Sequence, residues 1–522
     1  MSIQFIRSVL FLFSIITLVS TNAQIITSNQ IDSVVEKTLT TFDVPGIAVS
    51  VVKNGKVIHS KGYGVRSLNT KEKMTENTLF GIASNSKAFT AAALGMLQDE
   101  GKLKYDDKVR DYIPEFKMYD AYVTEEFTIR DLLTHRSGLG LGAGDLMFWP
   151  DSSNFTRKDI IYNLRYLKPV SSFRTKYDYD NLMYIIAGEV IARASGMSWE
   201  DFIETRILKP LQMTSTASSF SRLKDKSNVI DPHAPVDGKV KVIRRDWNET
   251  ANSAGGIYSN VVDMSKWIIM QMDNGKYGDG LKQQLFSEAV HDDMWTPQTI
   301  LPVRSKNAYN THFASYGLGW GLSDVKGYKQ ATHTGGLAGI VTQVTLIPDI
   351  KLGIIVFTNQ QSGAAFQSIT NTIKDSYLDV KGLDRIKENH DRVLKNEAEA
   401  QKITSQIWQK IADEQKNAPS KLNSSTVLGI YTDKWFGDVT VSEKNGKLWF
   451  ESKRSFLLSG EMFPYKGNTY VVKWTDRSMD ADAFAMFTLD SEGKANGLKM
   501  EAISPLTDFS FDFQDLDFVR VR

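Results

Sequence analysis

A serine and a lysine stand three positions apart at the start of a strongly helical segment. Ser84 and Lys87 open a run rich in alanine, leucine and methionine that ends near Gly101. Residues three apart share one face of a helix, so the two side chains can meet. A serine hydroxyl needs a base to become a nucleophile, and burial can lower the pKa of a lysine to roughly 7–8 so that it serves as one. Because a helix N-terminus also favours developing negative charge, the pattern predicts nucleophilic catalysis by Ser84.

The Ser-x-x-Lys spacing is a weak signal by itself because it recurs in the chain. It is also found at Ser50, Ser221, Ser323 and Ser491, none of which begins an apolar helix. A surface serine near a lysine is the alternative interpretation of every such pair. The helix that follows Ser84 is what distinguishes it as the candidate nucleophile.

A second motif, Tyr179-Asp180-Asn181, precedes another apolar helical run over residues 182–188. A tyrosine hydroxyl and an amide side chain delivered together can complete a proton relay and hold a substrate carbonyl. The same spacing occurs at Tyr258-Ser259-Asn260. An ordinary buried tyrosine with a satisfied hydroxyl is therefore the alternative for Tyr179.

The third motif, His333, Thr334, Gly335 and Gly336, stands just before a strand-like run over residues 341–348. Small residues there let a substrate backbone approach a strand edge, and a strand N–H can complete an oxyanion hole. A structural or surface histidine is the alternative. The seven histidines are dispersed and no His-Glu-x-x-His is present, so we expect no metal and no organic cofactor.

The elements that must position these motifs fall into three regions. A length of 522 residues favours two domains. Residues 24–381 mix strand-like and helical runs, as an α/β (α+β) domain does. Residues 382–425 are rich in Glu, Lys, Gln and Ala and predict a solvated helical linker. Residues 426–522 alternate short β-rich segments with turns and predict a small antiparallel barrel or sandwich.

Two pairs of strand-like runs bracket the first region. Residues 46–52 and 57–65 flank Asn54-Gly55, a dipeptide typical of tight hairpin turns. Residues 343–348 and 352–357 form a second pair late in the region. We expect both pairs to be antiparallel, with helices between them.

The amino-terminal residues predict export. One positive side chain is followed by an apolar run over residues 9–19 and by small residues up to Ala23. The run is shorter than the roughly 20 residues that a membrane-spanning helix needs. We interpret residues 1–23 as a cleaved signal peptide, with an uncleaved anchor as the alternative, and expect a periplasmic or secreted protein.

Composition narrows the possible chemistry and partners. There is no cysteine, which excludes thiol catalysis and disulfide bonds. The 62 basic and 61 acidic residues leave a net charge of +1, so neither nucleic acid nor an anionic membrane is an expected partner. We expect a small-molecule or peptide substrate, and the oligomeric state stays open.

Taken together, the order Ser-x-x-Lys, Tyr-x-Asn and His-Thr-Gly resembles the serine β-lactamase and penicillin-binding family, in its class C-like branch. Residues 128–139, 253–259 and 333–339 also look like segments of that branch. The resemblance covers residues 28–380 and implies an antiparallel sheet flanked by helices plus an all-helical subdomain. Residues 426–522 resemble the lipocalin-like module that follows some hydrolases of this branch.

The resemblance implies catalytic roles for three residues. Ser84 would be the acylated nucleophile, and Lys87 would accept its proton or tune Tyr179. Tyr179 would pass a proton to the leaving group and activate the hydrolytic water.

The resemblance also implies how a substrate is held. Asn181 would contact the substrate amide, and Thr334 and Gly335 would line the binding strand. The backbone N–H groups of Ser84 and Gly336 would form the oxyanion hole. His333 stands where β-lactamases more often have lysine. A neutral histidine offers a substrate carboxylate a hydrogen bond but no fixed positive charge.

These inferences predict an exported serine hydrolase that cleaves amide or peptide bonds, D-amino-acid or cell-wall peptides among them, or esters. A true class C-like β-lactamase is the nearest alternative. A non-catalytic penicillin-binding receptor or scaffold is the alternative from another class. The chain has no Gly-x-Ser-x-Gly, which disfavours an α/β-hydrolase.

Overall fold

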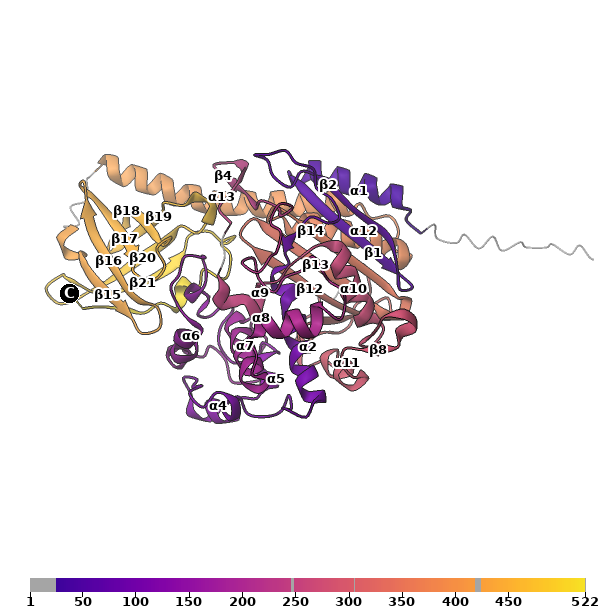
Figure 1. Ribbon diagram of the computed structural model, residues 1–522. Helices are drawn as coiled ribbons and strands as arrows, with labels where there is room; N and C mark the ends of the chain where they lie inside the picture. Colours follow the sequence, from indigo (N-terminus) through magenta and orange to yellow (C-terminus); the bar gives the residue numbers. More distant parts are fainter. Residues whose placement is uncertain (1–24, 246–247, 305, 418–423, 522) are drawn as a thin grey trace, which may run out of the picture.

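An eight-stranded antiparallel sheet organises the amino-terminal domain in the computed structural model, which describes residues 25–245, 248–304, 306–417 and 424–521 (Figure 1). The signal peptide predicted over residues 1–23 lies outside the described residues. In spatial order the strands are β2 (Lys56–Gly64), β1 (Gly46–Lys53), β14 (Leu352–Thr358), β13 (Ile340–Ile347), β12 (Tyr328–Leu337), β11 (Gly321–Val325), β10 (Ala314–Tyr316) and β9 (Thr299–Leu301).

Both predicted strand pairs are confirmed. β1 pairs with β2 around Asn54 and Gly55, whose φ angles of 52° and 72° are those of a type I′ turn. β13 pairs with β14 in the same antiparallel sense. β1 also pairs with β14, so strands from the beginning and the end of the domain lie next to each other in the sheet.

Alternation along the central strands divides the core into two layers. Ile47, Val49 and Val51 of β1 pack with helices α1 (Ser28–Thr41) and α12 (Gly363–Tyr377) on one face. On the other face, Ala48 belongs to the larger core that includes α10 (Val261–Met272). Figure 1 shows α1 and α12 near each other, next to β1 and β2.

Two apolar helices form the centre of the all-helical part. α2 (Ser86–Asp99) is buried from Ser86 to Leu97, and α7 (Asn181–Ser195) is buried along most of its length. Their apolar character on all sides reflects burial between other helices. Gly101, with φ +70°, comes just after the C-cap residue Glu100 of α2, near where the sequence predicted the end of the helix. Within the described ranges, no helix is both long enough and apolar enough to cross a membrane.

The carboxy-terminal domain is a closed barrel of eight antiparallel strands, which confirms the predicted fold class. Large side chains such as Phe450, Tyr470 and Trp474 are buried in it. The strands are β15 (Gly429–Asp433), β16 (Gly437–Lys444), β17 (Lys447–Ser452), β18 (Ser459–Lys466), β19 (Thr469–Trp474), β20 (Ala483–Leu489), β21 (Ala495–Ala502) and β22 (Phe518–Arg520).

One long helix, α13 (Arg385–Asn417), runs from the amino-terminal domain to the barrel and occupies most of the predicted linker (Figure 1). Ile386 near its start packs in the core beside α12. Ile407 and Ile411 pack against Val471 of the barrel. The helix is therefore anchored in both domains.

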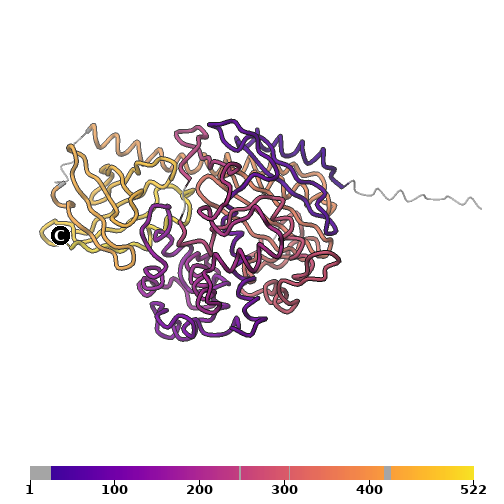
Figure 2. The backbone as a smooth tube through the Cα atoms, viewed as in Figure 1, coloured from indigo at the N-terminus to yellow at the C-terminus, as the bar shows by residue number. Residues whose placement is uncertain are grey.

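The chain between β21 and β22 returns to the amino-terminal domain. Figure 2 shows this yellow segment beside the violet segment of the amino-terminal domain. Asp512 accepts hydrogen bonds from the backbone N–H groups of Gly144 (2.6 Å) and Leu146 (2.9 Å). Asn163 donates to the Trp435 carbonyl at 2.8 Å. These contacts bring the barrel against the same loops that the site described next is built from.

Candidate active site

The structure brings Ser84 and Lys87 together at the start of α2. Ser84 lies in a short 3₁₀ turn, Ala83–Asn85, that leads directly into the helix. The Lys87 Nζ lies 3.1 Å from the Ser84 Oγ. Ala83 adopts a φ of +50°, a left-handed conformation that is costly for a residue other than glycine. Strain of this kind is found at functional sites, where the surrounding structure holds it in place.

The surroundings of Lys87 favour a neutral amine. The side chain is fully buried, and burial lowers its pKa to about 7 although Asp145 and Asp180 oppose the shift. Nζ also donates to the Asn181 Oδ1 (2.7 Å) and the Ala254 carbonyl (2.9 Å). A neutral amine has two N–H bonds and one lone pair. The two acceptors take both N–H bonds, so the lone pair faces the Ser84 hydroxyl.

We therefore expect reaction at Ser84 to depend on pH through Lys87. Only the neutral amine can accept the serine proton, and a pKa of about 7 means that this form is lost as the pH falls below 7. The rate of modification of Ser84 by a fluorophosphonate should rise about tenfold per pH unit up to about pH 7 and then level off. Intact-protein mass spectrometry from pH 5 to 9 measures it. A rate that is flat across this range would contradict a lysine base.

Tyr179 lies beside this pair, on the loop that precedes α7. The Lys87 Nζ is 4.8 Å from the centre of its ring. Burial raises the pKa of Tyr179 well above its usual value, and the Ser84 hydroxyl opposes that rise. Tyr179 is therefore protonated at neutral pH, and its hydroxyl can give a proton to a departing group.

Asn181 begins α7 and is engaged at both ends of its amide. Its oxygen accepts from Lys87, and its Nδ2 donates to the Asp145 Oδ2 at 2.8 Å. The residue is 8% exposed and still lines the cavity. The predicted contact of Asn181 with a substrate amide stays a prediction, whereas its contact with the lysine is a feature that the motif did not reveal.

Asp145 and Ser510 are polar residues of the site that the sequence motifs missed. Asp145 is fully buried, and burial raises the pKa of its carboxyl well above the usual value. Ser510, from the barrel, donates to the Asp145 Oδ2 at 2.8 Å. The two residues are 365 positions apart in the sequence, so they do not form a recognisable motif together.

His333 is buried on β12 and is neutral. Burial lowers its pKa to about 3, and the nearby Lys87 acts in the same direction. Its Nε2 lies 2.8 Å from the Tyr316 hydroxyl, and its Nδ1 lies 2.6 Å from the Thr334 carbonyl. His333 can thus take part in hydrogen bonds but brings no fixed positive charge to the site.

The strand that carries His333 presents one free edge to the site. Pairing of β12 with β11 ends at Thr332, while pairing with β13 continues to Leu337. Thr334 and Gly336 are exposed along this stretch. At Gly335 an added Cβ would stand 2.4 Å from the Ile82 carbonyl oxygen, so only glycine lets the strand approach the Ser84 turn this closely. An extended substrate segment can pair with such an edge.

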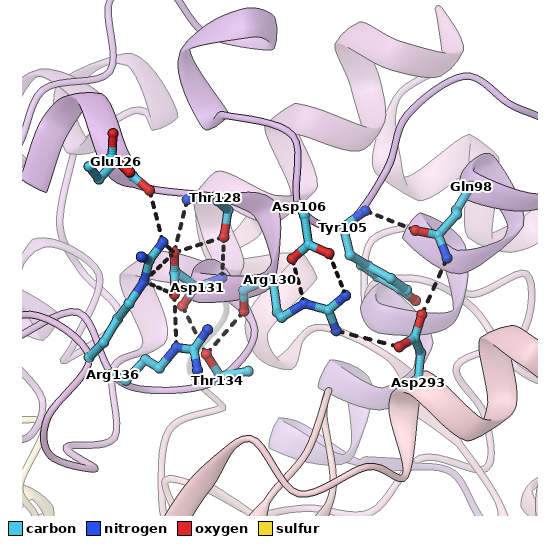
Figure 3. Close-up of polar contacts among 11 residues, drawn as sticks. Gln98, Tyr105, Asp106, Glu126, Thr128, Arg130, Asp131, Thr134, Arg136 and Asp293 are labelled. Carbon is cyan, nitrogen blue, oxygen red and sulfur yellow. Dashed lines mark hydrogen bonds and ion pairs between the residues drawn. The ribbon is translucent and has the colours of Figure 1, made fainter.

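Residues 128–139 pack against the loop that carries Tyr179 and support it. Figure 3 shows Asp131 among Thr128 and arginine side chains, and Arg130 between Asp106 and Asp293. Asp131 is fully buried, and its ion pairs with Arg136 (2.8 Å) and Arg174 (2.7 Å) compensate the buried charge.

His135 carries this support to the tyrosine. Its Nδ1 accepts from the Asp180 N–H at 3.1 Å, and its carbonyl accepts from the Asp178 N–H at 3.0 Å. Its ring lies 4.2 Å from that of Tyr179, centre to centre. Burial lowers the pKa of His135 well below its usual value, so the ring is neutral. The segment thus positions Tyr179 from both its backbone and its ring face.

A cavity of about 650 Å³ opens over these residues. Both domains contribute to its wall, the barrel through residues 478–480, Leu506 and residues 508–511. Among the described residues that line it, none is Lys or Arg, and three are aspartates. The predicted site residues in the lining are Ser84, Tyr179, Asn181, His333, Thr334 and Gly336.

Comparisons with known proteins agree with this architecture. Unguisins hydrolase ungD' of Aspergillus campestris is 29% identical over 66% of this chain and 65% of its own length. Unguisins hydrolase ungD of Aspergillus violaceofuscus is 27% identical over 79% and 76%. Protein flp of Staphylococcus aureus is 28% identical over 64% and 63%. This chain thus spans slightly less than two thirds of the length of the first and third relatives.

Solved structures share the fold across both domains. The octameric penicillin-binding protein homologue from Pyrococcus abyssi aligns with a TM-score of 0.59 at 21% identity, over 94% of this chain and 99% of that one. SurE aligns with a TM-score of 0.54 at 17% identity, over 95% and 99%. At these identities the likeness concerns the fold alone.

Family models divide the chain in the same way. Residues 413–520 match a domain of unknown function, DUF3471, which coincides with the barrel. Residues 31–378 match the model named Beta-lactamase, a stretch that holds all three motifs. The resemblance drawn from the motifs is thereby confirmed, and the chain belongs to the Beta-lactamase family of the β-lactamase fold, which includes named hydrolases.

Proposed function

We propose that the protein is an exported serine hydrolase that forms an acyl-enzyme on Ser84. The observation that carries the proposal is the arrangement around Lys87, whose two other hydrogen-bond partners leave its lone pair for the Ser84 hydroxyl. The family and the named hydrolases among the relatives support the same reaction type.

The reaction follows from the positions of these groups. Lys87 accepts the Ser84 proton as Oγ forms a bond to the substrate carbonyl carbon, and the carbonyl electron pair moves to its oxygen. When that pair returns, the bond to the leaving nitrogen or oxygen breaks, and Tyr179 gives this atom a proton. Water then attacks the ester on Ser84 with the same groups accepting and returning protons, which releases the acid product.

The charge of the cavity argues against a substrate that depends on a carboxylate. β-Lactams carry one, and it would meet a neutral His333 and a wall with no Lys or Arg among the described residues. Uncharged or amine-bearing amides and esters do not depend on such a cation. We therefore propose peptide-like amides, D-amino-acid and cell-wall peptides among them, as the substrate class, with esters as further substrates.

The test compares labelling with turnover. Purified protein is treated with a fluorophosphonate, the adduct is located by mass spectrometry, and uncharged chromogenic esters are compared with penicillins. We expect an adduct on Ser84 that Ser84→Ala abolishes, and at least tenfold higher kcat/KM for the esters. Faster opening of penicillins would favour a β-lactamase. An adduct without turnover would favour a receptor, and an adduct on Ser50, Ser221, Ser323 or Ser491 would refute the assigned nucleophile.

A further inference from the structure

The barrel reaches the catalytic lysine through a continuous series of hydrogen bonds. Ser510 donates to the Asp145 Oδ2 (2.8 Å), and the same oxygen accepts from the Asn181 Nδ2 (2.8 Å). The other end of that amide accepts from Lys87 (2.7 Å), which lies 3.1 Å from Ser84. Three side chains thus connect a barrel loop to the lysine, and each of them is less than 10% exposed.

The orientation of the Asn181 amide decides what Lys87 can do. With its oxygen toward Nζ, the amide accepts an N–H bond and leaves the lone pair of the neutral amine for Ser84. With the amide reversed, its NH₂ group would face Nζ, and the lone pair would point to Asn181 instead. A base that accepts from Asn181 cannot also accept the Ser84 proton.

Asp145 enforces the productive orientation because a carboxyl oxygen accepts from the NH₂ end of the amide. The barrel in turn fixes Asp145. Ser510 donates to its side chain, and Asp512 accepts from the N–H groups of Gly144 and Leu146 on either side of it. Barrel residues therefore restrain Asp145 at its carboxyl and at its flanking backbone.

We propose that Ser510 is a positioning residue for catalysis, through which the barrel holds Asp145 and Asn181 so that Lys87 can act as the base. This inference rests on the proposed function, because it assigns Lys87 the role of proton acceptor. It gives the barrel a part in the chemistry in addition to its part in the cavity wall.

Several ionisable groups surround this series. Asp180 and Lys87 act on Asp145, and Asp145 acts on Asp512. Lys87 faces Asp145 and Asp180, the neutral rings of His135 and His333, and the protonated Tyr179 and Tyr184. Both donors to Asp145 use Oδ2, which leaves Oδ1 to carry the proton of a neutral acid. A neutral Asp145 still accepts from Asn181, so the orientation persists without a buried negative charge.

The test is the pH profile of Ser84 labelling in Ser510→Ala. We expect the plateau above pH 8 to fall about tenfold, since one restraining hydrogen bond is lost. We also expect the midpoint to move to lower pH, because a reversed amide no longer accepts from the Lys87 ammonium. Ser510→Thr keeps the hydroxyl and should restore both values.

Ser504→Ala is the matched control, since the Ser504 hydroxyl accepts from the Leu506 N–H within the same loop and from no other group of the described residues. It should keep the wild-type plateau and midpoint. If Ser510→Ala is too unstable to purify, Ser510→Cys fills nearly the same volume with a weaker donor and should show the same loss.

Two results would overturn the inference: wild-type values in Ser510→Ala or Ser510→Cys, or an unshifted midpoint with a reduced plateau, which is what a merely structural role produces. Failure of the proposed function is recognised separately, because wild-type Ser84 would then not be labelled at all. A labelled wild type with an unaffected Ser510 variant refutes the inference and leaves the function in place.

Discussion

Replacing Lys87 with methionine will slow the acylation of Ser84 on the order of 10⁴-fold, at the upper end of what a general base contributes. Methionine fills the buried space but offers no lone pair of comparable basicity to the serine proton. The remaining rate should also lose its dependence on pH between 5 and 8, because the group that titrates near pH 7 is gone. Labelling reactions quenched at a series of times and analysed by mass spectrometry measure both effects.

The chain contains a matched control in its second buried lysine. Lys374 lies on α12, and burial lowers its pKa to about 7, as it does for Lys87. Its Nζ donates to the Gln330 Oε1 at 3.0 Å and lies 3.9 Å from the centre of the Tyr309 ring. Lys374→Met should keep the acylation rate within about threefold, since a residue remote from the chemistry contributes little to it. Equal losses in the two variants would mean that disturbed packing, rather than a missing base, explains the effect of Lys87→Met.

Replacing Tyr179 with phenylalanine will lower turnover of an amide substrate on the order of 10³-fold. The ring and its contact with Phe509 remain, while the proton donor to the leaving group is lost. An ester with a leaving group of low pKa needs less help from an acid and should lose far less. The comparison of kcat on an anilide and on a nitrophenyl ester of the same acyl group measures the difference.

Tyr177→Phe is the control for this prediction. Tyr177 lies on the same loop, lines the same cavity, and carries a hydroxyl of raised pKa because it too is buried. Removal of its hydroxyl should change kcat on the anilide less than fivefold, because the phenylalanine ring keeps the packing against His135 and Tyr316. If both substrates lose activity equally in Tyr179→Phe, the tyrosine does not protonate the leaving group.

Local pattern was sufficient to predict the parts of the site that local geometry builds. The meeting of Ser84 and Lys87 follows from their spacing at the start of a helix. The β1–β2 hairpin follows from Asn54-Gly55, whose left-handed conformations the tight turn requires. Evenly spaced strands and turns likewise indicated an antiparallel β domain at residues 426–522. In each instance, residues close in the sequence determine the local structure, whereas closure of the barrel depends on pairing of its first strand with its last.

The partners of Asn181 could not be predicted in this way. Asp145 begins a short 3₁₀ helix (Asp145–Met147) with no motif of its own, and Ser510 follows the seventh barrel strand. Their contact depends on how two domains pack, which depends in turn on many apolar contacts far from either residue. What distinguishes such residues is that their polar side chains are buried without a partner nearby in the sequence. Burial is known only from the structure, so the sequence alone does not identify them.

The division of the cavity wall between two domains has a consequence for how such proteins diverge. The groups that transfer protons belong to one domain, on helix α2 or next to α7, whereas residues 478–480, Leu506 and Asp508 stand on connections between barrel strands. Connections tolerate substitution and insertion better than the strands they join. After gene duplication, mutations in these connections can therefore change substrate specificity, while the catalytic residues are inherited unchanged.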